Sequence, residues 1–421
     1  MGEKADLYEQ CCNYTTYRGS NRRGPEEGGT DDHGEIIEGT GWCGVMLLIP
    51  GPVDVPEVVL RESAYVQNHR SEEFRNIVRS CQNRLNEIAD ASHSVITTGS
   101  GTTAVESMIY SMTRPGEKVM AVSFGEFGDR LVDSLKRRGT DTTVIKKSTR
   151  EYLKKGEITD ILGRHKGVST ICLVHNETGN GTGIRNLKEL VEEANSHGLK
   201  VLVDSVSGLG ALEIKANSWG IDAIATCSQK GLASVPGLGI VSLSDRGRKL
   251  VKAANDIPVY LDLEVSLKFL AKNETPYTPS TGSFRALNAA LNILEKEGIE
   301  TRWKRHHASA SFVRKIMMEF GQQLYGNEEN FSDTVVAFKP SLPVATVVKE
   351  LASRDIIVSK GMGHLADEMI RVGLLGIVDN TKIAIFLNAF SEIAGFDRTF
   401  EPEDLPAETS MYKGLLEAVN Q

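Results

Sequence analysis

The segment Gly99-Ser100-Gly101-Thr102-Thr103 combines glycines and hydroxyl side chains between an apolar run and a helical pattern. Glycines let backbone amides approach an anion closely, hydroxyls add hydrogen-bond donors, and a helix N-terminus carries about half a positive charge. The segment therefore predicts a phosphate-binding turn. The alternative is a plain strand-to-helix turn capped by Thr103 and Glu106. A Walker A loop is excluded because the Lys-Ser/Thr pair is missing.

Asp204 stands at the end of a second apolar run, which covers residues 200–204. A carboxylate at the carboxyl end of a strand can pair with a protonated pyridine nitrogen, and this pairing keeps such a ring an electron sink. The alternative is an exposed strand-end aspartate or a helix cap, which turn statistics favour for an aspartate on its own.

Lys230 lies in Ser228-Gln229-Lys230-Gly231, directly after the apolar run 221–226. A partly desolvated lysine amine can lose its proton, form a Schiff base with an aldehyde and then move protons. Most lysines are instead solvated surface charges. The nearly uncharged sequence GLASVPGLG that follows Lys230 weighs against that alternative, because a surface lysine normally has charged neighbours.

These residues need elements that bring them together, and the hydrophobic pattern supplies them. Strand-length apolar runs alternate with helical stretches. This alternation predicts an α/β fold with a mostly parallel, seven-stranded sheet that helices cover on both faces. Ligands of such sheets bind at the carboxyl ends of the strands, where all three motifs stand. The runs are 95–98, 119–122, 143–146, 171–174, 201–203, 221–226 and 238–243.

The chain divides into four predicted parts. Residues 1–45 are rich in glycine and charge and poor in aliphatic side chains, which predicts a flexible polar extension. Residues 46–296 are expected to form a large domain. Residues 297–400 are expected to form a smaller C-terminal α+β domain with short strands near 334–338 and 356–358, and residues 401–421 a loosely held tail.

The composition argues against several classes of protein. The chain has 48 Lys and Arg against 56 Asp and Glu, a net charge of −8, which offers no basic surface for nucleic acid. No run approaches the roughly 18 apolar residues of a membrane span, and no secretory signal is visible. Its 6 cysteines lack a C-x-x-C pair and metal-ligand spacing. They predict free thiols, no metal site and a cytoplasmic location.

The motifs GSGTTAVE, VHNETGNGTG, VLVDSVSGLG, SQKG and VPG follow one another in a characteristic order and spacing. In this order the chain resembles the class V aminotransferases, specifically the alanine-glyoxylate and serine-glyoxylate (serine-pyruvate) group. The resemblance covers residues 46–395, from LLIPGPVDVP and HRSEEF to IRVGLLG. It implies a fold-type I architecture, pyridoxal 5'-phosphate as cofactor, and a homodimer with shared active sites.

The same resemblance implies a role for each cofactor-binding residue. Lys230 would hold the cofactor as a Schiff base, and Asp204 would pair with its pyridine nitrogen. Thr178 would hydrogen-bond the phenolic oxygen of the ring. Val206 would pack on one ring face and Phe127 on the other, where family members commonly carry tryptophan or tyrosine. The phosphate ligands would be Ser100, Gly101, Thr102, Gln229 and, from the neighbouring subunit, Thr278.

Arg371, in Met-Ile-Arg-Val-Gly, matches the arginine with which the family binds the substrate carboxylate. A planar, permanently charged guanidinium suits a carboxylate, and an arginine on a short buried strand costs stability unless it is paired. Gly51, in a Pro-Gly-Pro turn, would bring backbone to the same pocket. The match at Thr275, near Thr278, is poorer, since the family often has an aromatic residue there.

The implied reaction moves an amino group from alanine or serine to glyoxylate or pyruvate in a ping-pong cycle. Transamination of aspartate or 2-aminoethylphosphonate on the same fold is the first alternative. A lyase or a cysteine desulfurase is the second, although no cysteine follows Cys227 to carry sulfur. A regulatory protein that binds the cofactor without turnover is the third, and the presence of both Lys230 and Arg371 argues against it.

Overall fold

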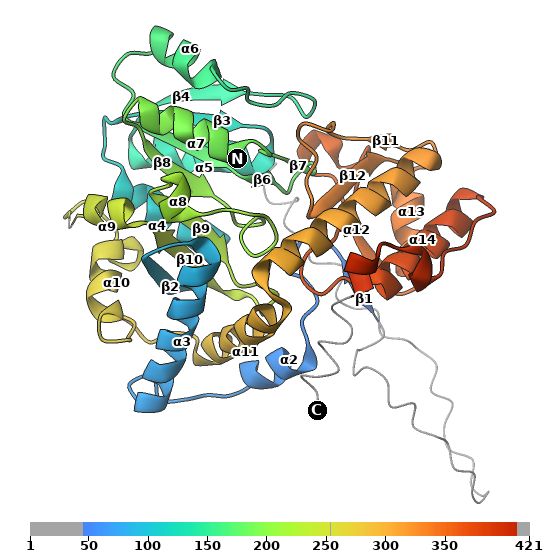
Figure 1. The fold of residues 1–421 in the computed structure, drawn as a ribbon, viewed down its shortest axis with the longest axis horizontal. Helices are drawn as coiled ribbons and strands as arrows, with labels where there is room; N and C mark the ends of the chain where they lie inside the picture. Colours follow the sequence, from blue (N-terminus) through green and yellow to red (C-terminus); the bar gives the residue numbers. More distant parts are fainter. Residues whose placement is uncertain (1–44, 253, 411–421) are drawn as a thin grey trace, which may run out of the picture. The chain divides into compact units, whose positions relative to one another are not determined.

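The computed structural model describes residues 45–252 and 254–410, which are drawn in colour in Figure 1. The predicted polar extension, apart from Val45, lies outside the described residues. Residues 411–421 of the predicted tail also lie outside them.

All seven predicted apolar runs form strands of one sheet, in the order β2-β10-β9-β8-β5-β3-β4. Strand β10 is antiparallel to β2 and β9, and the other neighbours in the sheet are parallel. The prediction of a mostly parallel sheet is therefore confirmed. The strands are β2 (His93–Gly99), β3 (Lys118–Ser123), β4 (Asp141–Lys146), β5 (Thr170–Val174), β8 (Lys200–Asp204), β9 (Ala223–Cys227) and β10 (Gly237–Leu243).

Amphipathic helices cover this sheet, each with its apolar stripe turned inward. Helix α4 packs on β9 and β10, α5 on β3, α3 on β2 and α7 on β8. A short hairpin of β6 (Asn176–Glu177) and β7 (Thr182–Gly183) follows β5. The helices are α2 (Glu57–Ser63), α3 (Glu72–Ala89), α4 (Gly101–Met112), α5 (Glu126–Arg138), α6 (Glu157–Arg164), α7 (Leu187–Ser196), α8 (Ala216–Trp219), α9 (Asp245–Leu250), α10 (Leu263–Leu270) and α11 (Thr281–Glu297).

A second sheet has five strands in the order β1-β13-β14-β12-β11, and β1 pairs in parallel with β13. Residues 46–48, expected in the large domain, belong instead to the small sheet, where Leu48 is buried in the core. The strands are β1 (Met46–Leu48), β11 (Gln323–Leu324), β12 (Val335–Lys339), β13 (Ile356–Lys360) and β14 (Ile370–Gly373), and the helices are α12 (Ile299–Glu319), α13 (Val344–Ala352) and α14 (Asn380–Ala394).

The first ten residues of the predicted tail differ from the expectation of a loosely held segment. They form two 3₁₀ turns, η3 (Pro402–Asp404) and η4 (Ala407–Ser410). Leu405 is buried in the core of the small sheet together with Phe400. Apolar contacts therefore hold this part of the segment in place.

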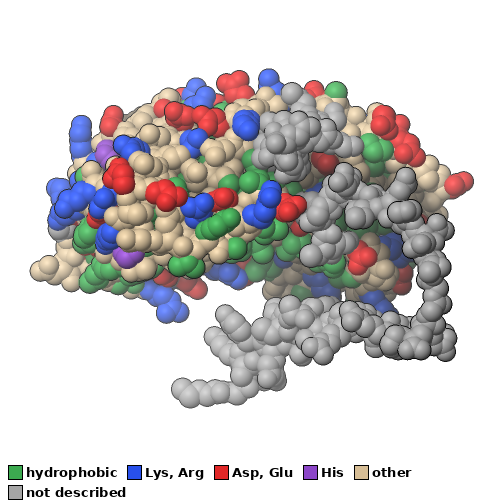
Figure 2. All heavy atoms as spheres, turned by 90° about the horizontal axis from the view of Figure 1, so that it is seen from below, with side chains coloured by type: hydrophobic (Ala, Val, Ile, Leu, Met, Phe, Trp, Pro, Cys, Tyr) green, Lys and Arg blue, Asp and Glu red, His purple; other side chains and the backbone are tan. Residues whose placement is uncertain are grey.

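The surface gives two further observations. Among the described residues, no helix combines the length and the apolar character that crossing a bilayer requires. On the face drawn in Figure 2, basic and acidic side chains are interspersed, and neither sign gathers into a continuous area. A polyanion would find no continuous basic track on that face.

Candidate active site

The carboxyl end of β8 carries Asp204, next to β5 on one side and β9 on the other. Its carboxylate accepts a hydrogen bond from the backbone amide of Val206 at 2.9 Å. None of the ion pairs in the described part of the chain includes Asp204, and burial raises its pKa to about 7. A buried carboxylate in this condition is suited to a cationic partner, such as a protonated ring nitrogen.

Lys230 follows β9 and turns toward the chain that leads out of β1. Its Nζ donates a hydrogen bond to the carbonyl oxygen of Pro50 at 2.5 Å. Burial lowers the pKa of Lys230, and the charge of Arg371 lowers it further, while Cys227 and Asp204 act in the opposite direction. The lysine amine therefore loses its proton more readily than a surface lysine does, as imine chemistry requires.

Gly51 lies against the Lys230 side chain. A Cβ atom at residue 51 would stand 2.6 Å from Cδ of Lys230 and 3.0 Å from its Nζ, and the φ angle of Gly51 is +123°. Only glycine combines this backbone conformation with so close an approach.

Gly51→Ala should therefore displace Lys230 and lower kcat/KM for the reaction that the resemblance implies at least about tenfold, because small misplacements of reacting groups are costly. Steady-state kinetics and the visible absorbance of bound cofactor would measure the change. Gly116→Ala is the matched control, since Gly116 has φ +78° but open space around its missing Cβ. Equal losses in the two variants would show that backbone strain, and not contact with Lys230, is responsible.

The predicted phosphate turn forms the start of α4. Ser100 is the N-cap residue and its backbone amide donates to Oγ1 of Thr103 at 3.2 Å, so the cap differs from the Thr103–Glu106 alternative. The side chains of Ser100 and Thr102 are exposed. A Cβ at Gly101 would lie 2.8 Å from Cγ1 of Val206. Glycine thus lets the helix N-terminus approach the residue that is predicted to cover the cofactor ring.

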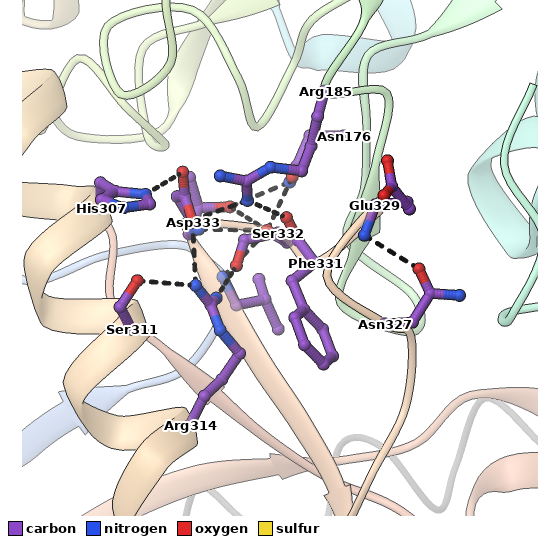
Figure 3. Close-up of polar contacts among 12 residues, drawn as sticks. Asn176, Arg185, His307, Ser311, Arg314, Asn327, Glu329, Phe331, Ser332 and Asp333 are labelled. Carbon is purple, nitrogen blue, oxygen red and sulfur yellow. Dashed lines mark hydrogen bonds and ion pairs between the residues drawn. The ribbon is translucent and has the colours of Figure 1, made fainter. Parts of the chain in front are cut away.

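The HNET segment places Thr178 between the two sheets. Its hydroxyl donates to Oγ of Ser207 at 2.6 Å, and its carbonyl oxygen accepts from Nη1 of Arg371 at 3.1 Å. Asn176 accepts a hydrogen bond from the Ser332 hydroxyl at 2.7 Å, beside the ion pair of Arg185 with Asp333, as Figure 3 shows. Polar contacts therefore tie the large sheet to the small one around the site.

Glu177, which was not among the predicted site residues, binds three backbone amides with its carboxylate. Its carboxylate accepts from the backbone amides of Phe127 at 3.1 Å, Gly128 at 3.0 Å and Gly179 at 2.9 Å. It therefore fixes the first turn of α5 and with it the half-buried Phe127. Burial raises the pKa of Glu177, although these amides favour the ionised form. The only sequence signal for this role was a single acidic residue in the otherwise uncharged segment Asn176-Glu177-Thr178-Gly179-Asn180.

Arg371 lies on β14 and reaches back toward the HNET segment. Its Nε donates to the carbonyl oxygen of Lys360 at 2.8 Å and its Nη1 to that of Thr178. No carboxylate pairs with it among the described residues, and burial lowers its pKa to about 10. A buried guanidinium held only by carbonyl oxygens is suited to a carboxylate ligand.

The remaining predicted residues lie at the edges of this group. Gln229 accepts from the amide of Val53 through its backbone carbonyl at 3.2 Å. Thr278 is exposed and lines a small cavity at the end of β2 with Thr98 and Tyr277. The contacts of this one chain do not join Thr278 to Lys230.

These residues fit pyridoxal phosphate. The turn at α4 offers exposed hydroxyls and a glycine where a side chain would collide. Asp204 is buried without an ion pair among the described residues, and the amine of Lys230 has a lowered pKa. Phosphate, ring nitrogen and aldehyde each find a suitable partner at one edge of the sheet.

Comparison with known proteins gives a consistent result. Residues 59–380 match the family described as Aminotransferase class-V. The chain is 31% identical to an uncharacterized aminotransferase of Methanocaldococcus jannaschii, over 87% of this chain and 96% of that protein. It is 29% identical to the L-aspartate–glyoxylate aminotransferase of Paracoccus denitrificans, over 78% of this chain and 86% of the relative.

Among solved structures, the alanine–glyoxylate aminotransferase of Nostoc sp. superposes with a TM-score of 0.77 at 26% identity. The alignment covers 85% of this chain and 97% of the Nostoc protein. The sequence match and the shared fold together show that this chain belongs to the class V aminotransferases, the pyridoxal-phosphate-dependent transaminases.

Proposed function

We propose that the chain transfers the amino group of a small amino acid, alanine or serine, to a 2-oxo acid, glyoxylate or pyruvate, by a ping-pong mechanism. The observation that carries the proposal is the pair formed by Lys230, whose amine is buried, and Arg371, whose guanidinium has no carboxylate partner among the described residues. A small amino acid needs both groups, one at its α-carbon and one at its carboxylate. The aminotransferases of Paracoccus and Nostoc, both named for glyoxylate, support the choice of acceptor.

Each residue has a defined task in this reaction. Pyridoxal phosphate, when bound, supplies an aldehyde for the amino group and a ring that accepts the electron pair of the α-carbon. Lys230 removes the α-proton and returns it, Asp204 keeps the ring nitrogen protonated, and Arg371 holds the α-carboxylate. Thr178 is assigned to the phenolic oxygen, and Val206 and Phe127 to the two ring faces.

We assign the phosphate to the N-terminus of α4, with Ser100, Gly101, Thr102 and Gln229 as ligands. Thr278 would come from a second copy of the chain, and we infer a homodimer on this basis. Support comes from the exposed apolar side chains around Thr278, since Val259 is 66% and Tyr260 44% exposed. Sedimentation of the purified protein tests the dimer, and a monomer that binds the cofactor fully would contradict it.

We further propose a reducing, cytoplasmic location. The three cysteines among the described residues, Cys81, Cys172 and Cys227, are buried as free thiols. Burial raises the pKa of each thiol to about 12, which keeps them unreactive.

Aspartate is the strongest alternative donor, because the Paracoccus relative is named for it. The deciding experiment is the absorption spectrum of the purified protein with pyridoxal phosphate, recorded after addition of alanine, serine, aspartate or 2-aminoethylphosphonate. The effective donor converts the cofactor to its amine form, and glyoxylate or pyruvate restores the original spectrum. Absence of any protein-bound cofactor band would contradict the proposal, and conversion by aspartate alone would replace alanine and serine.

Arg371→Met should raise KM about 100-fold for the amino acid and for the oxo acid alike, since both carboxylates lose a charge-assisted partner in a buried site. Steady-state kinetics with each substrate varied in turn measures the change. Arg354→Met is the control, because Arg354 lies in a half-buried ion pair with Glu350 in the small domain and is not among the proposed site residues. Unchanged KM values in Arg371→Met would move the carboxylate site elsewhere.

A further inference from the structure

Glu297, the last residue of α11, joins two arginines of α12. Its carboxylate accepts from Nη1 of Arg302 at 2.5 Å and from Nε of Arg305 at 2.6 Å. Each of the three side chains is at most 2% exposed. Burial alone would raise the pKa of Glu297, but the two arginines outweigh burial and lower it. The three residues therefore form a buried, ionised bridge, called the Glu297 bridge below.

Arg302 connects this bridge to the loops of Lys230 and Asp204. Its Nη2 donates to the carbonyl oxygen of Gly231 at 2.8 Å, and its Nε donates to that of Gly210 at 3.0 Å. Gly231 is the residue after Lys230, and Gly210 lies in the loop that follows Asp204. The two loops also meet each other, since a Cβ at Gly231 would stand 2.2 Å from the carbonyl oxygen of Leu209.

Arg305 connects the same bridge to the loop that follows Arg371 on β14. Its Nη2 donates to the carbonyl oxygen of Gly376 at 2.9 Å, and its Nη1 donates to that of Val378 at 3.0 Å. One carboxylate thus holds two guanidinium groups, and these hold the loops of the large sheet and of the small sheet. Side-chain networks of this kind act as a unit.

We propose that Glu297 is a positioning residue, which sets the place of Lys230 relative to Arg371 through the two arginines. This proposal rests on the proposed function, because it matters only if these two groups bind one substrate. A substrate with a carboxylate must reach both groups at once. A small amine nucleophile without a carboxylate needs only the cofactor held at Lys230.

This difference separates positioning from plain stability. In Glu297→Gln the amide nitrogen cannot accept from an arginine, so the two loops lose their common anchor. The rate at which an amino acid converts the cofactor should fall about 100-fold, in line with the cost of small misplacements. The rate at which hydroxylamine reacts with the bound cofactor should stay within about twofold of the wild-type rate, because that reaction does not use Arg371.

Two variants accompany Glu297→Gln. Glu297→Asp keeps the charge but shortens the side chain, and it serves where the glutamine variant does not fold. Asp222→Asn removes a buried carboxylate that pairs with Arg246 at 2.6 Å, next to the amino end of β9 and outside the Glu297 bridge. Asp222→Asn thus reports the effect of losing a buried ion pair elsewhere in the protein. In this variant the ratio of the amino-acid rate to the hydroxylamine rate should stay unchanged.

Hydrogen exchange of the full-length, cofactor-bound protein adds a readout that does not depend on turnover. Faster exchange at 228–233 and 374–378 together in the Glu297 variants, but not in Asp222→Asn, is the expected result. An equal fall of both rates would overturn the proposal, as would faster exchange confined to the α11–α12 junction. If the wild-type protein carried no covalently bound cofactor, the proposed function would be contradicted. The hydrogen-exchange result would still show whether Glu297 anchors the two loops.

Discussion

Lys230→Ala should lower kcat for transamination by about 10⁴-fold or more, because in the proposed reaction this single side chain supplies both the covalent anchor and the proton transfer. The amine lies against the Pro50 carbonyl oxygen in a buried setting, and the described contacts bring no second lysine amine to that point. No neighbouring lysine can therefore take over the α-proton. The variant should still bind pyridoxal phosphate through the α4 turn and Asp204.

The measurement has two parts. Borohydride reduction followed by peptide mass analysis should find the cofactor on the peptide containing residue 230 in the wild type and on no peptide in the variant. Single-turnover kinetics then gives the rate of proton transfer. Lys249→Ala is the control, because Lys249 is exposed on α9 and should keep full activity. A reduced cofactor attached at another lysine would refute the assignment.

Asp204→Asn should lower kcat by about 10³-fold, since asparagine cannot keep the ring nitrogen protonated and a preorganised charge at the reacting centre is lost. The same variant should stabilise the cofactor-free protein. Folding removes Asp204 from water without an ion pair to compensate for the lost hydration, and its pKa rises from 3.8 to about 7. Activity and stability are therefore expected to change in opposite directions.

The pH dependence follows from the direction of this shift. Between about pH 4 and pH 7 the unfolded chain has lost the proton of Asp204 while the folded protein keeps it, so stability falls as the pH rises. Above pH 7 the full penalty amounts to roughly 4 kcal/mol of unfolding free energy. An asparagine at this position carries no such penalty. The gain in stability of Asp204→Asn should therefore grow from pH 4 to pH 7.

Thermal unfolding of both cofactor-free proteins across this pH range measures the gain. Asp222→Asn, in contrast, should lose stability, because Arg246 then lacks its partner. Added pyridoxal phosphate should stabilise the wild type more than Asp204→Asn. A pH-independent difference between the two proteins would mean that a positive group already neutralises Asp204 in the cofactor-free state.

The sequence predicted the large sheet well because buried strands need continuous apolar runs, and seven such runs were visible. Strand ends and glycines also pointed to Asp204, Lys230 and the turn at Gly101 as candidate cofactor-binding residues, and their roles stay predictions. Residues 46–48 were expected in the large domain but form strand β1 of the small sheet, because no period can be read from so short a run. The antiparallel direction of β10 could not be predicted either, because an apolar run does not indicate the direction of its strand.

Other features escaped prediction because they depend on contacts distant in sequence. In the sequence, nothing distinguishes Glu297, Arg302 and Arg305 from charged residues on a solvent-exposed helix. In the structure the three side chains are buried and bind one another and the backbone of three loops. The acceptor of the Lys230 hydrogen bond, the carbonyl oxygen of Pro50, belongs to the backbone, so no residue type in the sequence indicates it. The fully buried Glu177 could have been suspected from its motif, but its partners on α5 could not.

The placement of β1 also has a consequence for biosynthesis. This strand leaves the ribosome first among the described elements, yet Met46 pairs with Ile356 and Leu48 with Val358, near the other end of the chain. The small sheet cannot close until the chain has been made as far as β14. Until then β1 lacks its partner strand while the large sheet folds. Arg371 also lies on this small sheet, so the proposed carboxylate-binding side of the Lys230 site is completed late in synthesis.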